Sequence, residues 1–200
     1  MIICLISGFL GSGKTTLMIE LGKRLGASGR RAAIIVNEVG EVGVDGAFIN
    51  ASGLKSVELT EGCICCSLSG SLQNTLRSIT TEYKPDVILI EPTGLALPTR
   101  IERIIRTSMI EHDGIFGIGV VDAYRGLKLE QEATLFFRRQ LEEVNVLAVN
   151  KVELVSEAQL QELEALLQTV EPKAEIVRMS ARNGTGVDEL EKLLEARLNV

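Results

Sequence analysis

The sequence predicts an α/β fold, a doubly wound and mostly parallel sheet of about seven strands with flanking helices. Three observations predict this fold. Short apolar runs rich in Val and Ile recur along the whole chain, stretches with helical periodicity separate them, and the first run leads directly into a glycine-rich motif. A repeated alternation of strand and helix is typical of βαβ units, which build parallel sheets.

The apolar runs are the expected strands. Most of them are hydrophobic at nearly every position, and this pattern indicates strands that are buried on both faces. The runs are Ile2–Ser7, Ala32–Val36, Ser56–Leu59, Val87–Ile90, Ile115–Val121, Asn145–Val149 and Glu175–Met179.

The clearest expected helix is Glu157–Val170, in which leucines recur on one face and Ser156 with Gln159 forms a capping box at the start. Because the chain has no repeat, low-complexity tract or Pro/Ser-rich linker, we expect one domain over residues 1–200. The glycine-rich stretch Asn37–Lys55 has no clear periodicity, which is typical of a functional loop. The other expected helices are Lys14–Leu25, Leu68–Thr81, Leu127–Glu142 and Val187–Leu198.

Composition limits the function classes. The chain has 200 residues, of which 46% are apolar and 24% charged, and its formal net charge is −6. These values indicate a globular protein and argue against nucleic acid as the main partner. No apolar run approaches the roughly 18 residues of a membrane span, so no membrane partner is expected. The run Met1–Ile6 lacks a charged leader, which argues against a signal peptide.

The segment Gly8–Thr15 matches the phosphate-loop pattern G-x-x-x-x-G-K-[ST] between the first expected strand and helix. Glycines let the backbone wrap a phosphate, and the helix N-terminus adds positive potential. We expect Lys14 to reach the β- and γ-phosphates and Thr15 to bind Mg²⁺. Kinases, ATPases and GTPases share this motif. The expected nucleotide-binding residues here are Gly8, Gly11, Ser12, Gly13, Lys14, Thr15 and Thr16.

An acid follows the most hydrophobic strand, in the sequence Glu91-Pro92-Thr93-Gly94. The carboxyl end of such a strand lies beside the phosphate loop in a doubly wound sheet. Glu91 is therefore a candidate Mg²⁺ ligand and, with Lys14 and Thr15, a candidate catalytic residue, while the Gly94 N–H is a candidate sensor of the γ-phosphate. The alternative is a solvated acid at a strand end.

Two later segments are candidates for binding the base. Asn150-Lys151-Val152-Glu153 resembles the guanine-binding sequence N-K-x-D, with Glu153 one methylene longer than the usual Asp. Its carboxylate can still accept two N–H bonds from guanine. Ser180-Ala181 follows the last strand, where backbone N–H groups often contact the base. Ordinary strand-end turns are the alternative for both segments.

Cys63, Cys65 and Cys66 form a dense cluster that can converge on one soft or borderline metal ion. Three thiolates leave an open position, which suits a site that loads and releases metal. A fourth ligand can come from water, a partner chain, Glu38 or Glu41. Inert buried cysteines, a redox pair and a structural zinc site are the alternatives. Adjacent cysteines of this kind indicate a reducing compartment, here the cytoplasm.

Together these motifs resemble the CobW-like branch of the metallochaperone P-loop GTPases. The resemblance extends over nearly the whole chain. Two differences from common members of the family are expected: Glu153 stands in place of the usual Asp, and their further C-terminal domain is lacking. The motifs that carry it are the phosphate loop, Asn37–Asp45, Gly62-Cys63-Ile64-Cys65-Cys66, Glu91–Gly94, Val121-Asp122-Ala123 and Asn150-Lys151.

The resemblance implies roles for several residues. Asn37–Asp45 would be switch I, with Glu38 linking nucleotide and metal states, and Glu91–Gly94 would be switch II. Asn150, Lys151 and Glu153 would bind guanine. Zn, Co or Ni would bind the three cysteines of the cluster.

The resulting hypothesis is a slow GTPase that uses Mg²⁺ and GTP. Its nucleotide state would be coupled to metal delivery or metallocofactor insertion into a client metalloprotein or corrinoid system. Neither the phosphate loop nor Glu91–Gly94 carries an evident arginine finger, so hydrolysis would need a client or a nucleotide-dependent homodimer. The alternatives are a small-molecule kinase with Arg100, Arg103 and Arg106 on a lid, and a nucleotide-gated scaffold with structural zinc.

Overall fold

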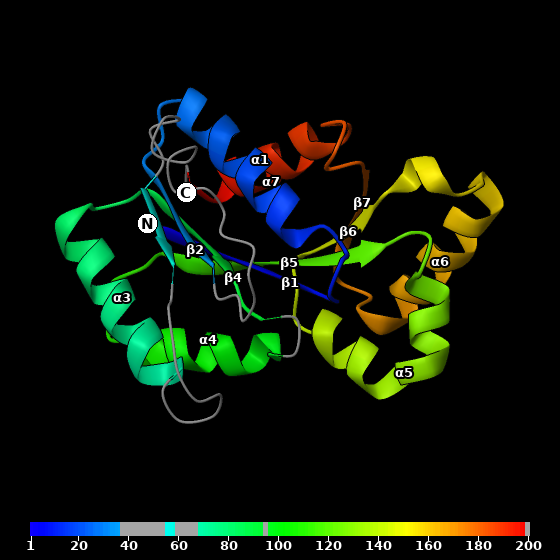
Figure 1. The fold of residues 1–200 in the computed structure, drawn as a ribbon, viewed down its shortest axis with the longest axis horizontal. Helices are drawn as coiled ribbons and strands as arrows, with labels where there is room; N and C mark the ends of the chain where they lie inside the picture. Colours follow the sequence, from blue (N-terminus) through cyan, green and yellow to red (C-terminus); the bar gives the residue numbers. More distant parts are fainter. Residues whose placement is uncertain (37–54, 59–67, 94–95, 199–200) are drawn as a thin grey trace.

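Seven parallel strands form one sheet at the centre of the protein, in the order β3-β2-β4-β1-β5-β6-β7 (Figure 1). The computed structural model describes residues 1–36, 55–58, 68–93 and 96–198, with the backbone alone at 55–58 and 68–71. All strand pairings are parallel, and the predicted doubly wound sheet is confirmed. The strands are β1 (Ile2–Gly8), β2 (Ala32–Val36), β3 (Lys55–Glu58), β4 (Val87–Glu91), β5 (Gly114–Asp122), β6 (Val146–Asn150) and β7 (Glu175–Met179).

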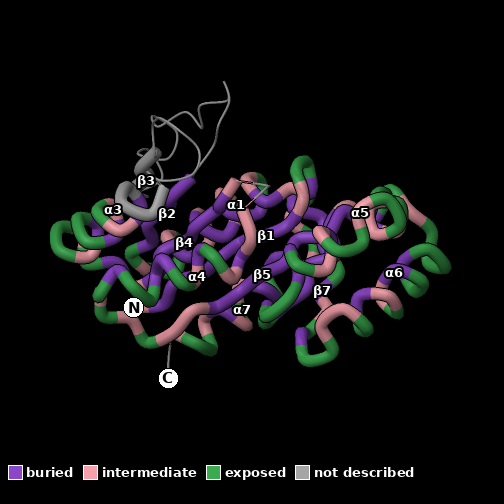
Figure 2. The backbone as a smooth tube through the Cα atoms, turned by 90° about the horizontal axis from the view of Figure 1, so that it is seen from below, coloured by how far each residue is buried: buried purple, intermediate pink, exposed green. Residues whose placement is uncertain are grey.

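The central strands are buried on both faces, as their uninterrupted apolar sequences predict (Figure 2). Along β1, Ile2, Cys4 and Ile6 join one core cluster, whereas Ile3 and Leu5 join another on the opposite face. This alternation follows from the two-residue period of a strand. The sheet therefore needs helices on both faces.

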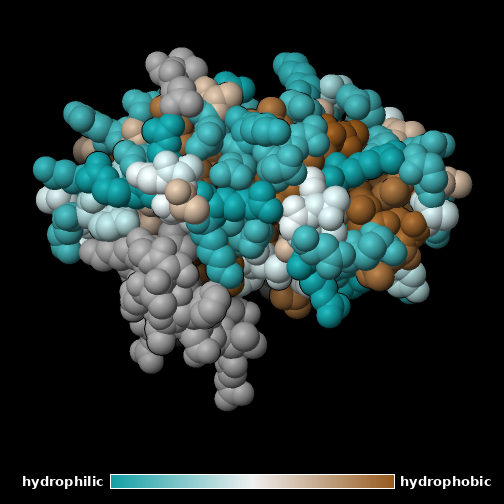
Figure 3. Space-filling view, turned by 90° about the horizontal axis from the view of Figure 1, so that it is seen from above, coloured by the Kyte–Doolittle hydropathy of each residue, from teal (hydrophilic) through white to brown (hydrophobic). Residues whose placement is uncertain are grey.

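Helices α1 (Lys14–Ala27) and α7 (Val187–Leu198) cover one face of the sheet. The other face is covered by α3 (Leu68–Glu82) and α4 (Pro98–Thr107) near β1 and β4, and by α5 (Gly126–Leu141) and α6 (Glu157–Val170) near β5 and β6. The capping box predicted at the start of α6 is present, because Ser156 accepts from Gln159 N–H. The face shown in Figure 3 is largely hydrophilic, with its hydrophobic side chains concentrated on the right-hand side.

Helix α4 was not among the predicted helices. In this helix Ile101, Ile104 and Ile105 form an apolar stripe at helical spacing and are buried against the sheet. Arg100, Arg103 and Arg106 lie on its exposed face, as a solvated arginine stripe would. Among the described residues, none of the helices has the length and apolar character needed to cross a bilayer.

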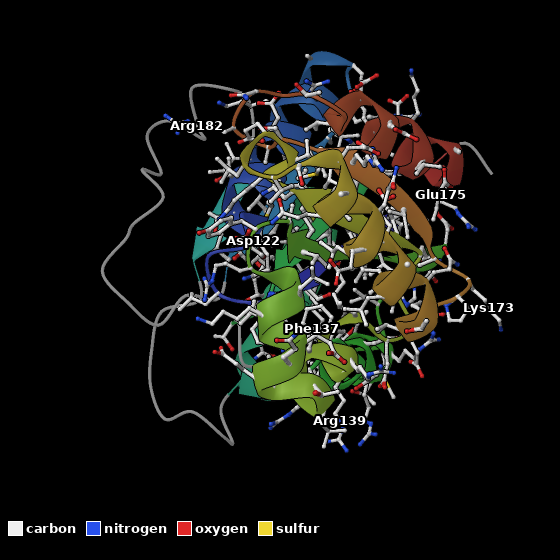
Figure 4. The ribbon with its side chains drawn as sticks, turned by 90° about the vertical axis from the view of Figure 1, so that its right-hand side faces the viewer. Asp122, Phe137, Arg139, Lys173, Glu175 and Arg182 are labelled. Atoms are coloured by element: carbon white, nitrogen blue, oxygen red, sulfur yellow. The ribbon has the colours of Figure 1, made fainter. Side chains whose placement is uncertain are left out.

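Parallel strands bring their carboxyl ends to one edge of the sheet. In register, Gly8 is opposite Val120, Asp122 is opposite Asn150, and Glu91 is opposite Val36. Figure 4 shows this edge from the side. Asp122, at the end of β5, lies on the side opposite Glu175, at the start of β7. Most of the predicted site residues that the structure describes lie at or just beyond this carboxyl edge.

Candidate functional site

The phosphate loop connects β1 to α1 through a backbone that requires glycine. Gly8 has a φ of +129°, and a Cβ there would lie 2.2 Å from the carbonyl oxygen of Val120 in β5. Gly13 has a φ of +100°, and a Cβ there would lie 2.2 Å from Nδ2 of Asn150. Side chains at these positions would meet strained dihedrals and occupied space. The loop is therefore packed directly against the ends of β5 and β6.

Lys14 is the first residue of α1 and is buried beside the phosphate loop. Its side chain is 5% exposed, and Nζ donates to the carbonyl oxygen of Phe9 at 3.1 Å. Nζ also lies 3.7 Å from Oε1 of Glu91, whose side chain is 11% exposed. Burying a cation and an acid together is costly unless they pair or serve a ligand. The structure thus brings Lys14 and Glu91 together, with Thr15 half-buried in the first turn of α1.

The donor set at this position fits Mg²⁺. Thr15 carries a hydroxyl and Glu91 a carboxylate, and oxygen is the ligand that this hard cation prefers. Both residues lie next to Lys14 in space or in sequence. Their role as Mg²⁺ ligands stays a prediction.

Asn150 joins the phosphate loop to the last predicted loop of the site. Its side chain is buried; Nδ2 donates to the carbonyl oxygen of Ser12 at 2.7 Å, and Oδ1 accepts from the Ala181 N–H at 2.9 Å. One side chain therefore connects β1–α1 with the segment after β7. Because both the Nδ2 and the Oδ1 of Asn150 are hydrogen-bonded to the backbone of these loops, Asn150 positions the loops around the site.

Lys151 and Asp122 form a second connection. The Lys151 ammonium donates to the Gly11 carbonyl oxygen at 2.6 Å and lies 2.7 Å from Oδ2 of Asp122. The Lys151 backbone has a φ of +67°, in the left-handed region. Asp122 is buried at the end of β5. The lysine side chain is thereby held across the edge of the sheet, between the phosphate loop and the end of β5.

Glu153 lies in the short 3-10 helix η1 (Val152–Leu154) and is exposed. Ser180 and Ala181 follow β7 and are buried, and the Ser180 N–H donates to the Thr185 carbonyl oxygen at 2.9 Å. The Ser180 Oγ, like the Ser12 Oγ, is buried with no hydrogen-bond partner among the described residues. Such orphaned hydroxyls are uncommon in proteins. Both flank Asn150, at the edge where the nucleotide is predicted to bind.

Several predicted residues lie outside the described residues: Glu38, Glu41, Cys63, Cys65, Cys66 and Gly94. Thr16 is described and exposed on α1. Within residues 1–36, 72–93 and 96–198, no group of three or more His, Cys, Asp or Glu side chains could hold a metal ion. The predicted cysteine metal site therefore stays a prediction. Cys4 is buried in β1, and this burial raises the pKa of its thiol far above the ordinary value.

Sequence reasoning missed two features of this site. Phe9 packs its ring against Phe136 and Phe137 of α5, with centroid separations of 5.4 and 5.8 Å, so the phosphate loop is anchored to that helix. Arg125, just before α5, places Nη1 3.5 Å from the carbonyl oxygen of Leu10. Both contacts join residues more than a hundred positions apart, and no local pattern in the sequence marks them.

A family model described as the CobW/HypB/UreG nucleotide-binding domain matches residues 2–178. The chain belongs to this family. Members of the CobW/HypB/UreG family share the nucleotide-binding domain whose loops are described above, and the match includes the phosphate loop and the Asn150-Lys151 segment. The predicted resemblance to CobW-like proteins is thus confirmed.

Two relatives resemble this chain over most of its length. The chain is 36% identical over 149 residues to the zinc chaperone YeiR of Escherichia coli K12, which covers 74% of this chain and 45% of that protein. It is 29% identical over 219 residues to the zinc-regulated GTPase metalloprotein activator 1 of Dictyostelium discoideum, which covers 88% of this chain and 45% of that protein. The chain therefore spans less than half the length of these relatives.

Solved structures show the same fold. The hydrogenase maturation factor HypB of Archaeoglobus fulgidus has a TM-score of 0.74 at 21% identity, over 98% of this chain and 90% of that one. The Zn(II)-bound YjiA GTPase of E. coli has a TM-score of 0.63 at 23% identity, over 88% of this chain and 56% of that one. At these identities the likeness establishes the fold alone.

Proposed function

We propose that this protein binds and hydrolyses GTP, and that its nucleotide state is coupled to the delivery of a transition metal to a client. The observation that carries the first part is the joined geometry of the phosphate loop and the base-binding segments through Asn150. The family and the names of its relatives support the second part.

The phosphate half of the site supports a role in phosphoryl transfer. Catalysis of this reaction depends mainly on positioning and charge stabilisation rather than on covalent chemistry by the protein. Lys14 supplies a buried positive charge, and α1 directs its N-terminus at the loop. Mg²⁺ held by Thr15 and Glu91 would neutralise charge on the β- and γ-phosphate oxygens.

The base half supports a guanine preference. Asn150 fixes the phosphate loop, Lys151 lies across the edge of the sheet, and Glu153 follows on η1. A carboxylate at this point can accept both N–H bonds from the guanine edge, and adenine lacks that pair of donors. Glu153→Asp tests the contribution of the longer side chain.

Phosphate release and nucleotide titration test the enzymatic part of the proposal. We expect the wild-type protein to release phosphate from GTP with Mg²⁺ at least tenfold faster than from ATP. Lys14→Ala should abolish release, whereas Lys128→Ala, an exposed lysine on α5, should not change it. Equal rates with ATP and GTP would contradict the guanine preference, and no release with either would contradict the GTPase.

Metal coupling is proposed to run through Cys63, Cys65 and Cys66. Three thiolates suit zinc, cobalt or nickel, and zinc is the metal in the names of the relatives. Ordering of switch segments by the γ-phosphate would then change the metal affinity of the cluster.

A competition titration with a chromophoric chelator tests this coupling. We expect the zinc affinity to differ at least tenfold between protein loaded with a non-hydrolysable GTP analogue and protein loaded with GDP. The triple variant C63S/C65S/C66S should lose this zinc site, whereas Cys4→Ala should keep it because Cys4 is buried within β1. Equal zinc affinities in the two nucleotide states would contradict the coupling while leaving the GTPase intact.

A further inference from the structure

Arg125 is held in place by the turn that follows β5. The buried Oδ1 of Asp122 accepts hydrogen bonds from the backbone N–H groups of Tyr124 at 2.9 Å and Arg125 at 3.2 Å. The carboxylate is itself fixed on its other oxygen by Lys151. Figure 4 shows Asp122 at this edge of the sheet. The backbone of Arg125 is thus fixed at the N-cap of α5, while its side chain is exposed.

The guanidinium of Arg125 lies against the phosphate loop. Its Nη1 is 3.5 Å from the Leu10 carbonyl oxygen, and the position of a Cβ on Gly11 would also be 3.5 Å from Nη1. Because Gly11 has no side chain, that residue places nothing between the guanidinium and the loop backbone. A larger residue at position 11 would lie in contact with the arginine.

Lys14 marks where the end of a bound triphosphate would lie. The lysine of a phosphate loop reaches the β- and γ-phosphates. Lys14 Nζ contacts the carbonyl oxygen of Phe9, and Arg125 Nη1 approaches the next carbonyl oxygen along the loop, that of Leu10. The two cations therefore approach adjacent peptide units, Lys14 from the buried side and Arg125 from the exposed side.

We propose that Arg125 is a catalytic residue, an arginine finger carried by the same chain, which donates hydrogen bonds to the terminal phosphate of GTP during hydrolysis. This inference rests on the proposed GTPase function. The sequence predicts no arginine finger in the phosphate loop or in Glu91–Gly94, and the fold supplies one from the β5–α5 turn.

The chemistry suits a guanidinium. A water oxygen forms a bond to the γ-phosphorus, the bond from that phosphorus to the β–γ bridging oxygen breaks, and GDP leaves with the electron pair. The water proton passes to the released phosphate. Negative charge grows on the bridging and γ-phosphate oxygens, and a planar, permanently charged group with several N–H donors stabilises it.

Arg125→Ala and Arg125→Lys test the proposal. We expect kcat for GTP to fall about 100-fold or more in both variants, because arginine fingers contribute this much or more to hydrolysis. GDP affinity, measured with a fluorescent analogue, should stay within about threefold of wild type. The complex with GDP and aluminium fluoride, which imitates the transferred phosphoryl group, should form with the wild-type protein and not with Arg125→Ala.

Arg139→Ala is the matched control, since Arg139 is an exposed arginine near the other end of α5 (Figure 4). Its kcat and aluminium fluoride complex should equal those of wild type. An Arg125→Ala protein with unchanged kcat would overturn the inference alone. A parallel loss of GDP affinity and kcat, with the aluminium fluoride complex retained, would assign Arg125 to loop support and also overturn it. A wild-type protein that neither hydrolyses GTP nor forms the complex would overturn the proposed function itself.

Discussion

The two edges of the sheet differ in how they hold polar side chains. At the carboxyl edge, Lys14, Glu91, Asp122 and Asn150 are all buried and contact other elements of the site. At the amino edge, Arg31 and Asp86 form an ion pair whose side chains are 55% and 36% exposed. The same strands begin at one edge and end at the other, so the fold alone does not require polar side chains to be more buried at the carboxyl edge.

This difference shows that the groups whose burial lowers the stability of the protein are concentrated at the carboxyl edge. A buried polar group lowers stability unless it is fully hydrogen-bonded, and a buried charge does so more strongly. The described residues at the carboxyl edge carry several such groups, including the orphaned hydroxyls of Ser12 and Ser180. A cost concentrated at one edge is typical of a functional site. Substitutions at the carboxyl edge should therefore have large effects, and matched substitutions at the amino edge small ones.

The largest expected effect is on the phosphate loop. Gly8→Ala puts a methyl group 2.2 Å from the Val120 carbonyl oxygen at a φ of +129°. We expect the free energy of unfolding to fall by about 3 kcal/mol or more, since strain and a clash with strand backbone add together. Nucleotide binding should be lost. Chemical denaturation and nucleotide titration measure the two quantities.

Gly29→Ala is the control for that substitution. Gly29 also has a positive φ, +85°, but a Cβ there would meet nothing within 4 Å. It lies between α1 and β2, near the amino edge. We expect a loss of about 1 kcal/mol from the dihedral alone, with nucleotide affinity unchanged. Equal losses for Gly8→Ala and Gly29→Ala would contradict the close packing of the phosphate loop against β5.

The next largest effect is expected for Asn150→Ala, which leaves the Ser12 carbonyl oxygen and the Ala181 N–H without their buried partner. Unfolding free energy should fall by about 2–3 kcal/mol. Nucleotide affinity should fall about 100-fold, because the phosphate loop and the last loop of the site are no longer joined.

Asn145→Ala, at the other end of the same strand, is the comparison. The Oδ1 of Asn145 accepts from the Gly117 N–H at 2.8 Å, but the residue is exposed and water can replace it. We expect a loss of about 0.5–1 kcal/mol and no change in nucleotide affinity. A nucleotide defect in Asn145→Ala equal to that of Asn150→Ala would show that the affinity loss reflects general destabilisation.

The sequence was sufficient for the central strands of the sheet, because strands that are buried on both faces read as uninterrupted apolar runs. It also located the phosphate loop and Asn150-Lys151, since these motifs have fixed local spacing. The list of predicted helices was wrong to omit α4, whose apolar stripe is Ile101, Ile104 and Ile105.

The connections within the site could not be predicted. The sequence marked Asp122 only through a resemblance, and its hydrogen bonds to the next turn and to Lys151 depend on how β5 and β6 are paired. Arg125 and Leu10 are separated by 115 positions and meet only after β1 and β5 pair. Contacts of this kind depend on tertiary packing, which periodicity and motif spacing do not encode.

A moderate effect is expected for Asp122→Asn. The amide oxygen can still accept from the Tyr124 and Arg125 N–H groups, but the negative charge facing Lys151 is lost. We expect the unfolding free energy to fall by about 1–2 kcal/mol, since one partner of a largely buried ion pair is neutralised. Nucleotide affinity should fall about tenfold because Lys151 also contacts the phosphate loop. An Asp122→Asn protein with wild-type stability and affinity would show that this ion pair does not hold the edge together.

The smallest effect is expected for the equivalent change at the amino edge, Asp86→Asn. The Asp86 Oδ2 accepts from the Arg31 N–H at 2.8 Å, and an asparagine oxygen can keep that bond. Only the ion pair with the Arg31 guanidinium, 3.8 Å away and largely in solvent, is lost. Exposed ion pairs contribute between about 0 and 1 kcal/mol, so the change in unfolding free energy should stay within about 0.5 kcal/mol. Nucleotide affinity should not change. If Asp86→Asn destabilised the protein as much as Asp122→Asn, burial would not explain the contrast between the two edges, and the case for a functional site at the carboxyl edge would lose its energetic support.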